Sequence, residues 1–220
     1  MILAHLSDIH LGFSAYERMV HGRNARTRDV EEAFLKAVSQ VVALKPDLVI
    51  LAGDILDHPH PDSGGLVALT DGLSALREGL PEAPILAVAG ERDTPLLRVD
   101  PGVLAALDRF PGVDAAGSVP RSVFLRHLDA HVLLLPHRAI RQEPFAAVRP
   151  EPKAAHNLLV FHGRLQGEGG LPVSEADWDY IALGSGHRMA RPAARAVDAG
   201  SLERVSVDPW SEALEEKGFI

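Results

Sequence analysis

Five short apolar runs, each followed by residues that can hold a metal ion, constrain the fold more than any other feature of this chain. The length of each run suits a buried β-strand. The runs, with the candidate ligands that follow them, are 2–7 with Asp8 and His10, 47–52 with Asp54, 84–89 with Glu91 and Asp93, 157–161 with His162, and 180–183 with His187. Because α/β proteins present ligands from the loops after their strands, we expect these side chains to build one metal site.

Taken singly, each of these motifs is a weak signal. Asp8 and His10 are two residues apart, a spacing that places both on one face of a strand but often arises by chance. Asp54 is also explained as a turn residue, His162 as a hydrogen-bonded core histidine, and His187 as a surface histidine in a glycine-rich turn. All these explanations would have to hold independently after five successive strands, so the joint pattern favours a metal site.

Composition restricts which atoms can bind a metal ion and where in the cell the protein is expected. The chain has no cysteine among its 220 residues, so nitrogen and oxygen atoms must hold any metal. A hydrophobic content of 46% suits one core, which predicts a single domain over residues 1–220. No apolar run approaches the roughly 18 residues of a membrane span, and Asp8 comes too early for a signal peptide, so we expect a cytoplasmic protein.

The net charge of -8 argues against a protein that binds nucleic acid through its whole surface. A nuclease remains compatible with this charge, because bound divalent ions would reverse its sign inside the cleft that receives a phosphate.

Periodicity predicts strands alternating with helices in the first half and mostly strands in the second. Helices are expected at 29–45, where Asp29 and Glu32 suggest a capping box, at 66–80 and at 100–110. Later strands are expected at 122–126, 131–135, 157–162, 180–183 and 202–207. Residues 143–155 are interpreted as a surface connection and 164–172 as a mobile loop beside His162. These elements predict helices packed outside two stacked sheets.

The chain resembles the calcineurin-like metallophosphoesterase superfamily in the order of its motifs, which are Asp8-x-His10, Gly53-Asp54, Gly90-x-x-Asp93, His162 and Gly184-x-x-His187. Within it, the SbcD-type DNA repair exonucleases are similar at Asp8-Ile9-His10-Leu11-Gly12, Asp179-Tyr180-Ile181-Ala182-Leu183-Gly184, Gly200-Ser201-Leu202-Glu203-Arg204 and Glu216-Lys217-Gly218-Phe219. The resemblance implies an α/β fold, a four-layer αββα sandwich of two mixed sheets flanked by helices. It also implies two adjacent metal ions, usually manganese. Asp54 would bridge them, Asp8, His10 and His187 would complete the first site, and His162 would serve the second.

Three residues differ from the family pattern. Glu91 and Arg92 replace the asparagine and histidine of Gly-Asn-His-Asp, and Ser185 replaces the first histidine of Gly-His-x-His. Glu91 can bind a hard ion, whereas the hydroxyl of Ser185 is a poor substitute for imidazole, so the second site should bind metal more weakly. Arg92 can clamp a phosphate but stays protonated, so it cannot act as a general acid. We expect catalysis at Asp54 and Arg92, and substrate binding by Arg92, Ser185 and Arg188.

Other polar groups carry weaker signals. A basic stretch is either a solvated loop or a contact for a phosphate backbone, with equal weight; it comprises Arg18, His21, Arg23, Arg26 and Arg28. His58 and His60 follow Asp54 and are expected to be bystanders rather than ligands.

Together these features predict a metal-dependent phosphodiesterase or nuclease acting on DNA, with activity reduced by the three substitutions. One alternative is a catalytically impaired SbcD-like homologue that binds nucleic acid or protein. Another is a small-molecule phosphomonoesterase or cyclic-nucleotide phosphodiesterase. The sequence given ends near where the exonucleases continue into a capping domain and an ATPase-docking segment, so we expect neither addition and no ATPase partner of the SbcC kind. A homodimer is left open.

Overall fold

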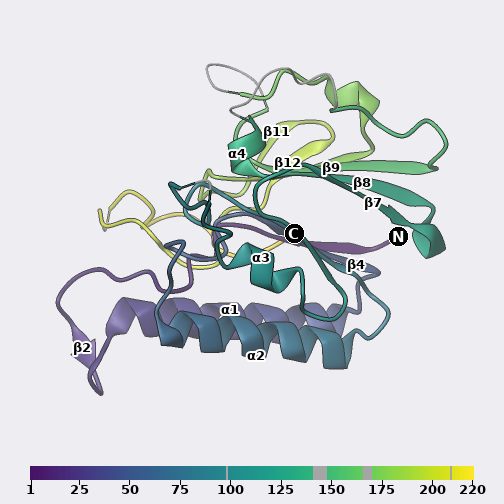
Figure 1. Ribbon diagram of the computed structural model, residues 1–220. Coiled ribbons are helices and arrows are strands. Elements are labelled where there is room, and N and C mark those ends of the chain that lie inside the picture. Colours follow the sequence, from purple (N-terminus) through teal and green to yellow (C-terminus); the bar gives the residue numbers. More distant parts are fainter. Residues whose placement is uncertain (98, 141–147, 166–169, 209) are drawn as a thin grey trace.

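The computed structural model describes residues 1–97, 99–140, 148–165, 170–208 and 210–220, and it contains two stacked β-sheets with helices outside them (Figure 1). The first sheet has the order β1-β4-β5-β6, formed by β1 (Leu3–Leu6), β4 (Leu48–Ala52), β5 (Ile85–Val88) and β6 (Val113–Ala116). All three of its pairings are parallel, as expected for strands that are almost continuously buried.

The second sheet is mixed and has the order β11-β12-β10-β9-β8-β7. Its strands are β7 (Arg121–Leu125), β8 (Ala130–Leu135), β9 (His156–His162), β10 (Tyr180–Gly184), β11 (Ala190–Ala193) and β12 (Ala196–Asp198). Aliphatic side chains from both sheets, including Ile50, Val88, Leu134 and Val160, form the core between them. Burying these side chains holds the two sheets face to face.

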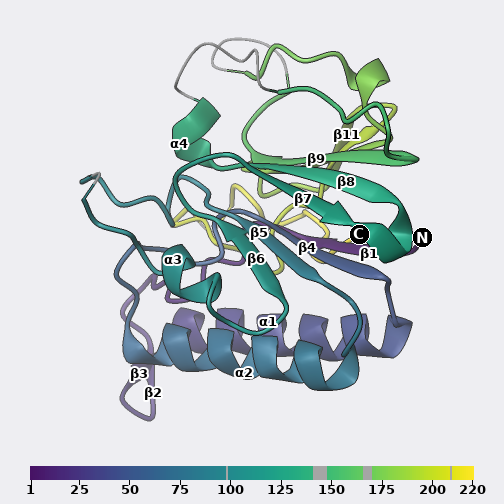
Figure 2. The same cartoon turned by 45° about the vertical axis from the view of Figure 1, so that its right-hand side comes forward.

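Two long helices cover the outer face of the first sheet (Figure 2). They are α1 (Ala25–Leu44) and α2 (Ser63–Gly79), and α3 (Leu104–Leu107) is a single turn. The helices pack closely because Gly72 has no side chain, and a Cβ there would lie 2.3 Å from the ring of Phe34. The outer face of the second sheet carries only short turns in the described residues, α4 (His137–Ile140) and the 3₁₀ turn η3 (Glu175–Asp177).

The predicted αββα architecture is confirmed, with the first sheet parallel rather than mixed. The expected capping box at Asp29 is wrong, because α1 begins four residues earlier. The side chain of Asn24 accepts hydrogen bonds from the backbone N–H groups of Arg26 and Thr27 and so caps this helix. Asn24 also ends a small hairpin of β2 (Met19–Val20) and β3 (Arg23–Asn24).

The strand expected at 202–207 does not form. The carboxylate of Glu212 accepts a hydrogen bond from the backbone N–H of Val205 at 3.1 Å, so a side chain takes the place of a neighbouring strand. The chain then returns to the first sheet, where the backbones of Ile220 and His5 exchange two hydrogen bonds. This return carries the C-terminal segment past the carboxyl ends of the strands.

Parts of the two predicted connections, residues 143–147 and 166–169, lie outside the described residues. Among the described residues, no helix combines the length and apolarity that crossing a membrane requires.

Candidate metal centre

The predicted ligands that follow β1, β4, β9 and β10 converge at the carboxyl ends of these strands. Four of them, Asp8, His10, Asp54 and His187, have positive φ angles between 48° and 53°. This left-handed region is uncommon for residues other than glycine and typically costs energy, so it is often found where side chains are held for function. The sharp turns after the strands therefore aim these side chains into one space.

The convergent side chains form two overlapping groups of metal-ligating atoms. One group is Asp8, His10 and His187, and the other is Asp8, Asp54 and His162, with all ligand atoms in each group within 4.8 Å of one another. Asp54, a member of the second group, also lies close to the first. Its Oδ2 is 3.3 Å from Nε2 of His162 and 3.7 Å from Nε2 of His10.

The orientation of the imidazoles fits a bound cation. Nδ1 of His10 lies 2.9 Å from a carboxylate oxygen of Asp57, and Nδ1 of His187 lies 3.0 Å from one of Glu212. A carboxylate partner holds the proton on Nδ1 and leaves the Nε2 lone pair free for a metal. The Nε2 atoms of His10 and His187 face each other at 3.2 Å. A shared cation would turn this juxtaposition of two lone pairs from repulsive to favourable.

His162 is oriented in the same way by the backbone. Its Nδ1 lies 3.0 Å from the carbonyl oxygen of Ala52 and its Nε2 points to Asp54. Burial opposes a charge on His162, but the hydrogen bond to Asp54 and the charges of Asp54 and Asp8 outweigh it and raise the pKa to about 10. The site thus favours positive charge, and its donors, imidazole nitrogen and carboxylate oxygen, suit manganese, iron or zinc.

Comparison of the sequence with known families agrees with a metal site. The sequence profile of the calcineurin-like phosphoesterases matches residues 1–185. The chain belongs to the calcineurin-like phosphoesterase family. This family uses divalent metals, and the two groups are the candidate sites for them in this chain.

Among its relatives are archaeal proteins named DNA double-strand break repair protein Mre11. That of Methanopyrus kandleri is 27% identical, over 87% of this chain and 45% of its own length. That of Methanococcus maripaludis is 30% identical, over 43% of this chain and 24% of its own length. The chain thus spans less than half the length of these relatives. Among solved structures, Pseudomonas putida nuclease MPE is similar with a TM-score of 0.34 and 16% identity, covering 71% of this chain and 58% of that one.

The loop after β5, which differs from the family pattern, also holds the side chain of Asp54 in place. The backbone N–H of Arg92 donates to Oδ1 of Asp54 at 2.7 Å. Asp93 is 2% exposed and accepts hydrogen bonds from the backbone N–H groups of Gly90, Ile55 and Leu56. Burial, reinforced by the charge of Asp54, raises the pKa of Asp93 to about 6. Asp93 therefore ties this loop to the segment that carries Asp54.

The three residues that differ from the family pattern line a cavity of about 450 Å³. Four of the candidate ligands line the same cavity: His10, Asp54, His162 and His187. Glu91, Arg92 and Ser185 are all exposed. Among the described residues, the two groups of ligand atoms do not include Glu91. Ser185 instead contributes its backbone N–H, which lies 3.1 and 2.9 Å from the two oxygens of Asp8.

Other predicted polar residues lie apart from the cavity. Arg188 pairs with Glu215 at 3.0 Å and is not in the cavity lining. Of the basic stretch, three arginines pair with acidic residues, as Arg23–Glu31, Arg26–Asp29 and Arg28–Glu32. This pairing supports the interpretation of a solvated face. His60 pairs with Asp100, and neither it nor His58 belongs to a metal-ligating group among the described residues.

Sequence reasoning missed the groups that hold the imidazoles. Asp57 follows Asp54 by three residues, a proximity that could have suggested its role. Glu212 lies 25 residues beyond His187 and gave no local signal. The side chain of Lys217 is 8% exposed, and its Nζ donates to Glu212, to the hydroxyl of Ser201 and to the carbonyl of His187. Glu212 and Lys217 together brace the His187 loop.

Proposed function

We propose that the protein is a metal-dependent phosphodiesterase that acts on DNA as a nuclease. The observation that carries this proposal is the pair of ligand groups that share Asp8 and whose other members line one cavity, with their imidazoles held through Nδ1. The names of the Mre11 relatives, which place them in DNA double-strand break repair, support the choice of DNA.

The proposed division of labour follows from the chemistry of each group. Bound divalent ions would supply an activated water and neutralise charge on the phosphoryl oxygens. Asp8, His10 and His187 would hold the first ion. Asp8, which the two groups share, would also serve the second ion together with Asp54, His162 and Glu91, where Ser185 leaves one imidazole fewer than the family pattern has. Manganese is the metal we propose.

Arg92 would hold the phosphate through its guanidinium, which stays protonated and offers a planar fork of donors. It cannot supply a proton to the departing oxygen, and absence of a general acid typically costs a rate factor on the order of 10² to 10⁴. We therefore expect slow turnover with alkoxide leaving groups and faster turnover with p-nitrophenolate, which needs no proton.

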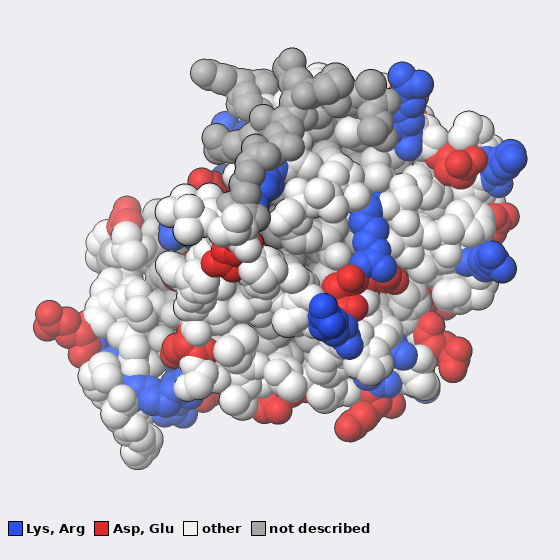
Figure 3. All heavy atoms as spheres, viewed as in Figure 1, with Lys and Arg blue, Asp and Glu red and all other residues white. Residues whose placement is uncertain are grey.

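Binding of DNA would be local to this cavity, because acidic and basic side chains are interspersed on the face in Figure 3. Together with the net charge of -8, this distribution argues for phosphate recognition at the metal ions and Arg92. A cytoplasmic location is part of the proposal.

Hydrolysis of bis-p-nitrophenyl phosphate and of single-stranded DNA tests the proposal. Activity should require a divalent metal and be abolished by Asp54→Asn. The absence of hydrolysis with manganese, iron, nickel and zinc would refute it. Higher rates on cyclic nucleotides or p-nitrophenyl phosphate than on DNA would instead indicate a small-molecule phosphoesterase.

A second candidate function is a non-catalytic module that binds nucleic acid or protein. It is favoured by the absence of Glu91 from both groups of ligand atoms in the described residues, and by Ser185 offering a backbone N–H where an imidazole is expected. This candidate predicts DNA binding without turnover. The triple variant Glu91→Asn, Arg92→His and Ser185→His should then gain activity, whereas an active wild-type protein would exclude this candidate.

A further inference from the structure

A second cavity, of about 350 Å³, lies directly beside the metal centre. Ser185 lines both cavities, so the two adjoin at the turn after β10. The volume falls in the range of small-molecule sites, which is roughly 300–1,000 Å³. A molecule bound in this second cavity could therefore be continuous with one held at the metal centre.

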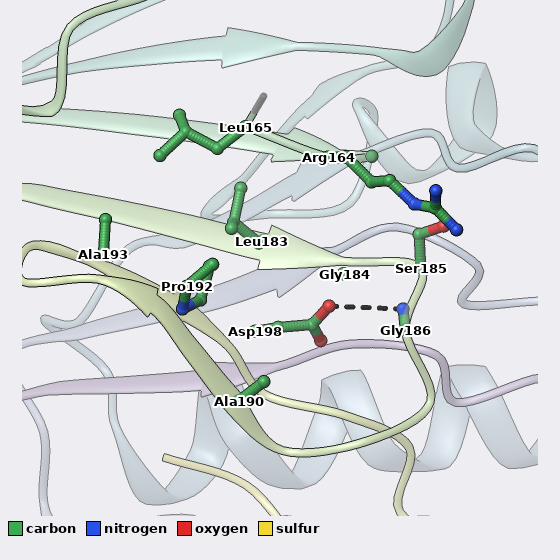
Figure 4. Close-up of a pocket in the computed structure, with 11 residues that line it drawn as sticks. Arg164, Leu165, Leu183, Gly184, Ser185, Gly186, Ala190, Pro192, Ala193 and Asp198 are labelled. Carbon is green, nitrogen blue, oxygen red and sulfur yellow. Dashed lines mark hydrogen bonds between the residues drawn. The ribbon is translucent and has the colours of Figure 1, made fainter. Parts of the chain in front are cut away.

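The two ends of this cavity differ in character (Figure 4). Leu165, Pro192 and Ala193 lie toward one end, and Arg164 and Ser185 lie at the other. Leu183 and Leu165 are buried beneath the surface, so the apolar end is backed by the core of the second sheet. Such an arrangement suits a flat ring at the apolar end joined to a charged group at the polar end.

Asp198 supplies a fixed hydrogen-bond acceptor inside this cavity. Its Oδ2 accepts from the backbone N–H of Gly186 at 3.2 Å and its Oδ1 from that of Gly200 at 3.0 Å. A carboxylate has about four lone-pair positions, so each oxygen can accept a further hydrogen bond from a ligand. Gly186 also admits the carboxylate closely, since a Cβ there would lie 2.7 Å from Oδ2.

Arg164 adds positive charge at the end shared with the metal centre. It is exposed, and no ion pair joins it to a carboxylate within the described part of the chain. A guanidinium placed there can contact a phosphate or stack on a base. The cavity thus offers an apolar wall, an acceptor and a cation in one small space.

We infer that this cavity binds a nucleobase that carries an exocyclic amino group, from a nucleotide adjoining the phosphodiester at the metal centre. The inference rests on the proposed function for the position of the phosphodiester. Carboxylates accept hydrogen bonds from base amino groups, as with N4 of cytosine. Thymine is disfavoured because its only N–H lies between two carbonyl oxygens, which would face Asp198.

Binding of deoxynucleoside monophosphates in the presence of chelator tests the inference without any metal. By ligand-observed NMR titration, dAMP, dCMP and dGMP should bind at least about fivefold more tightly than TMP, the lower end of the discrimination expected of a good base contact. Asp198→Asn should remove this preference. Equal binding of all four nucleotides, or no binding at millimolar concentration, would overturn the inference.

Filling the cavity provides a test that does not depend on the loops held by Asp198. Ala193→Phe places a ring in the cavity and should abolish binding, whereas Ala194→Phe, at an exposed neighbour outside the lining, should not. Unchanged binding in the Ala193 variant would overturn the assignment. Hydrolysis of bis-p-nitrophenyl phosphate by the wild-type protein is measured in parallel. Turnover without nucleotide binding refutes only the proposal that the second cavity binds a nucleobase. Nucleotide binding without turnover refutes only the proposed phosphodiesterase activity.

Discussion

The carboxylate of Glu212 is expected to control how tightly His187 holds a metal ion. It lies 3.0 Å from Nδ1 of His187, is 6% exposed and pairs with Lys217 at 2.8 Å. Burial raises its pKa, but hydrogen bonds from Lys217 and His187 outweigh that effect and lower it, so Glu212 is ionised at neutral pH. An ionised carboxylate on Nδ1 makes Nε2 a stronger donor to a metal.

Glu212→Gln keeps an oxygen that can accept from Nδ1 but removes the negative charge. Loss of such a partner typically weakens metal affinity by about 10- to 100-fold, which corresponds to about 1.4–2.7 kcal/mol. Manganese titration by calorimetry would measure the change. Thermal unfolding in chelator would show separately how much stability the substitution removes.

Glu215→Gln is the matched control for this prediction. Glu215 lies in the same segment and pairs with Arg188 and, at 3.9 Å, with Lys217, but it contacts none of the candidate ligands. Its substitution should leave manganese affinity within about twofold of wild type, because its closer ion pair is with the exposed side chain of Arg188 and such pairs contribute little energy. Equal affinities for wild type and Glu212→Gln, or an equal loss in both variants, would refute the reasoning.

Two further substitutions test the packing around the site. Gly90→Ala should lower metal occupancy and phosphodiesterase activity, because its Cβ would lie 2.2 Å from Oδ1 of Asp54. The control is Gly117→Ala, whose Cβ would have its nearest contact at an ordinary 3.6 Å. Elemental analysis of both variants measures the metal occupancy. His5→Leu should flatten the loss of stability below neutral pH. His5 is 0% exposed and burial lowers its pKa from 6.5 to about 3, so the unfolded chain binds a proton that the folded chain does not between those pH values. In the wild type, the free energy of unfolding should decrease as the pH is lowered through that window, by up to about 1.4 kcal/mol per pH unit. Urea denaturation at pH 7 and 5 that gives the same difference for both proteins would contradict this assignment.

The strands that carry the candidate ligands were predictable because their signal is local. Buried runs such as 48–52 and 158–161 are apolar without interruption, and Asp54 and His162 follow them directly. The resemblance then implied the four-layer arrangement of two sheets between helices. What it left unresolved was the position of side chains at the altered residues, since the place of Glu91 or Ser185 depends on how each loop is held.

Elements specified by distant contacts could not be read from local patterns. β11 reads Ala-Arg-Pro-Ala and is mostly exposed, so it carries no periodicity and forms by pairing with β12. Residues 202–207 carry strand-like residues but meet the carboxylate of Glu212. Glu212 meets His187 from a segment 25 residues further along, which ends where Ile220 pairs with His5 of β1. Such contacts between distant segments leave no trace in a short window of sequence.

Metal stoichiometry tests the central claim most directly. Elemental analysis of protein purified without chelator, followed by manganese titration, would count the ions and rank their affinities. The ligand groups around Asp8 predict one tightly held ion per chain and a second, weaker one at higher manganese concentration, with both lost in Asp8→Asn. A protein that contains no metal and takes up no manganese would contradict the account.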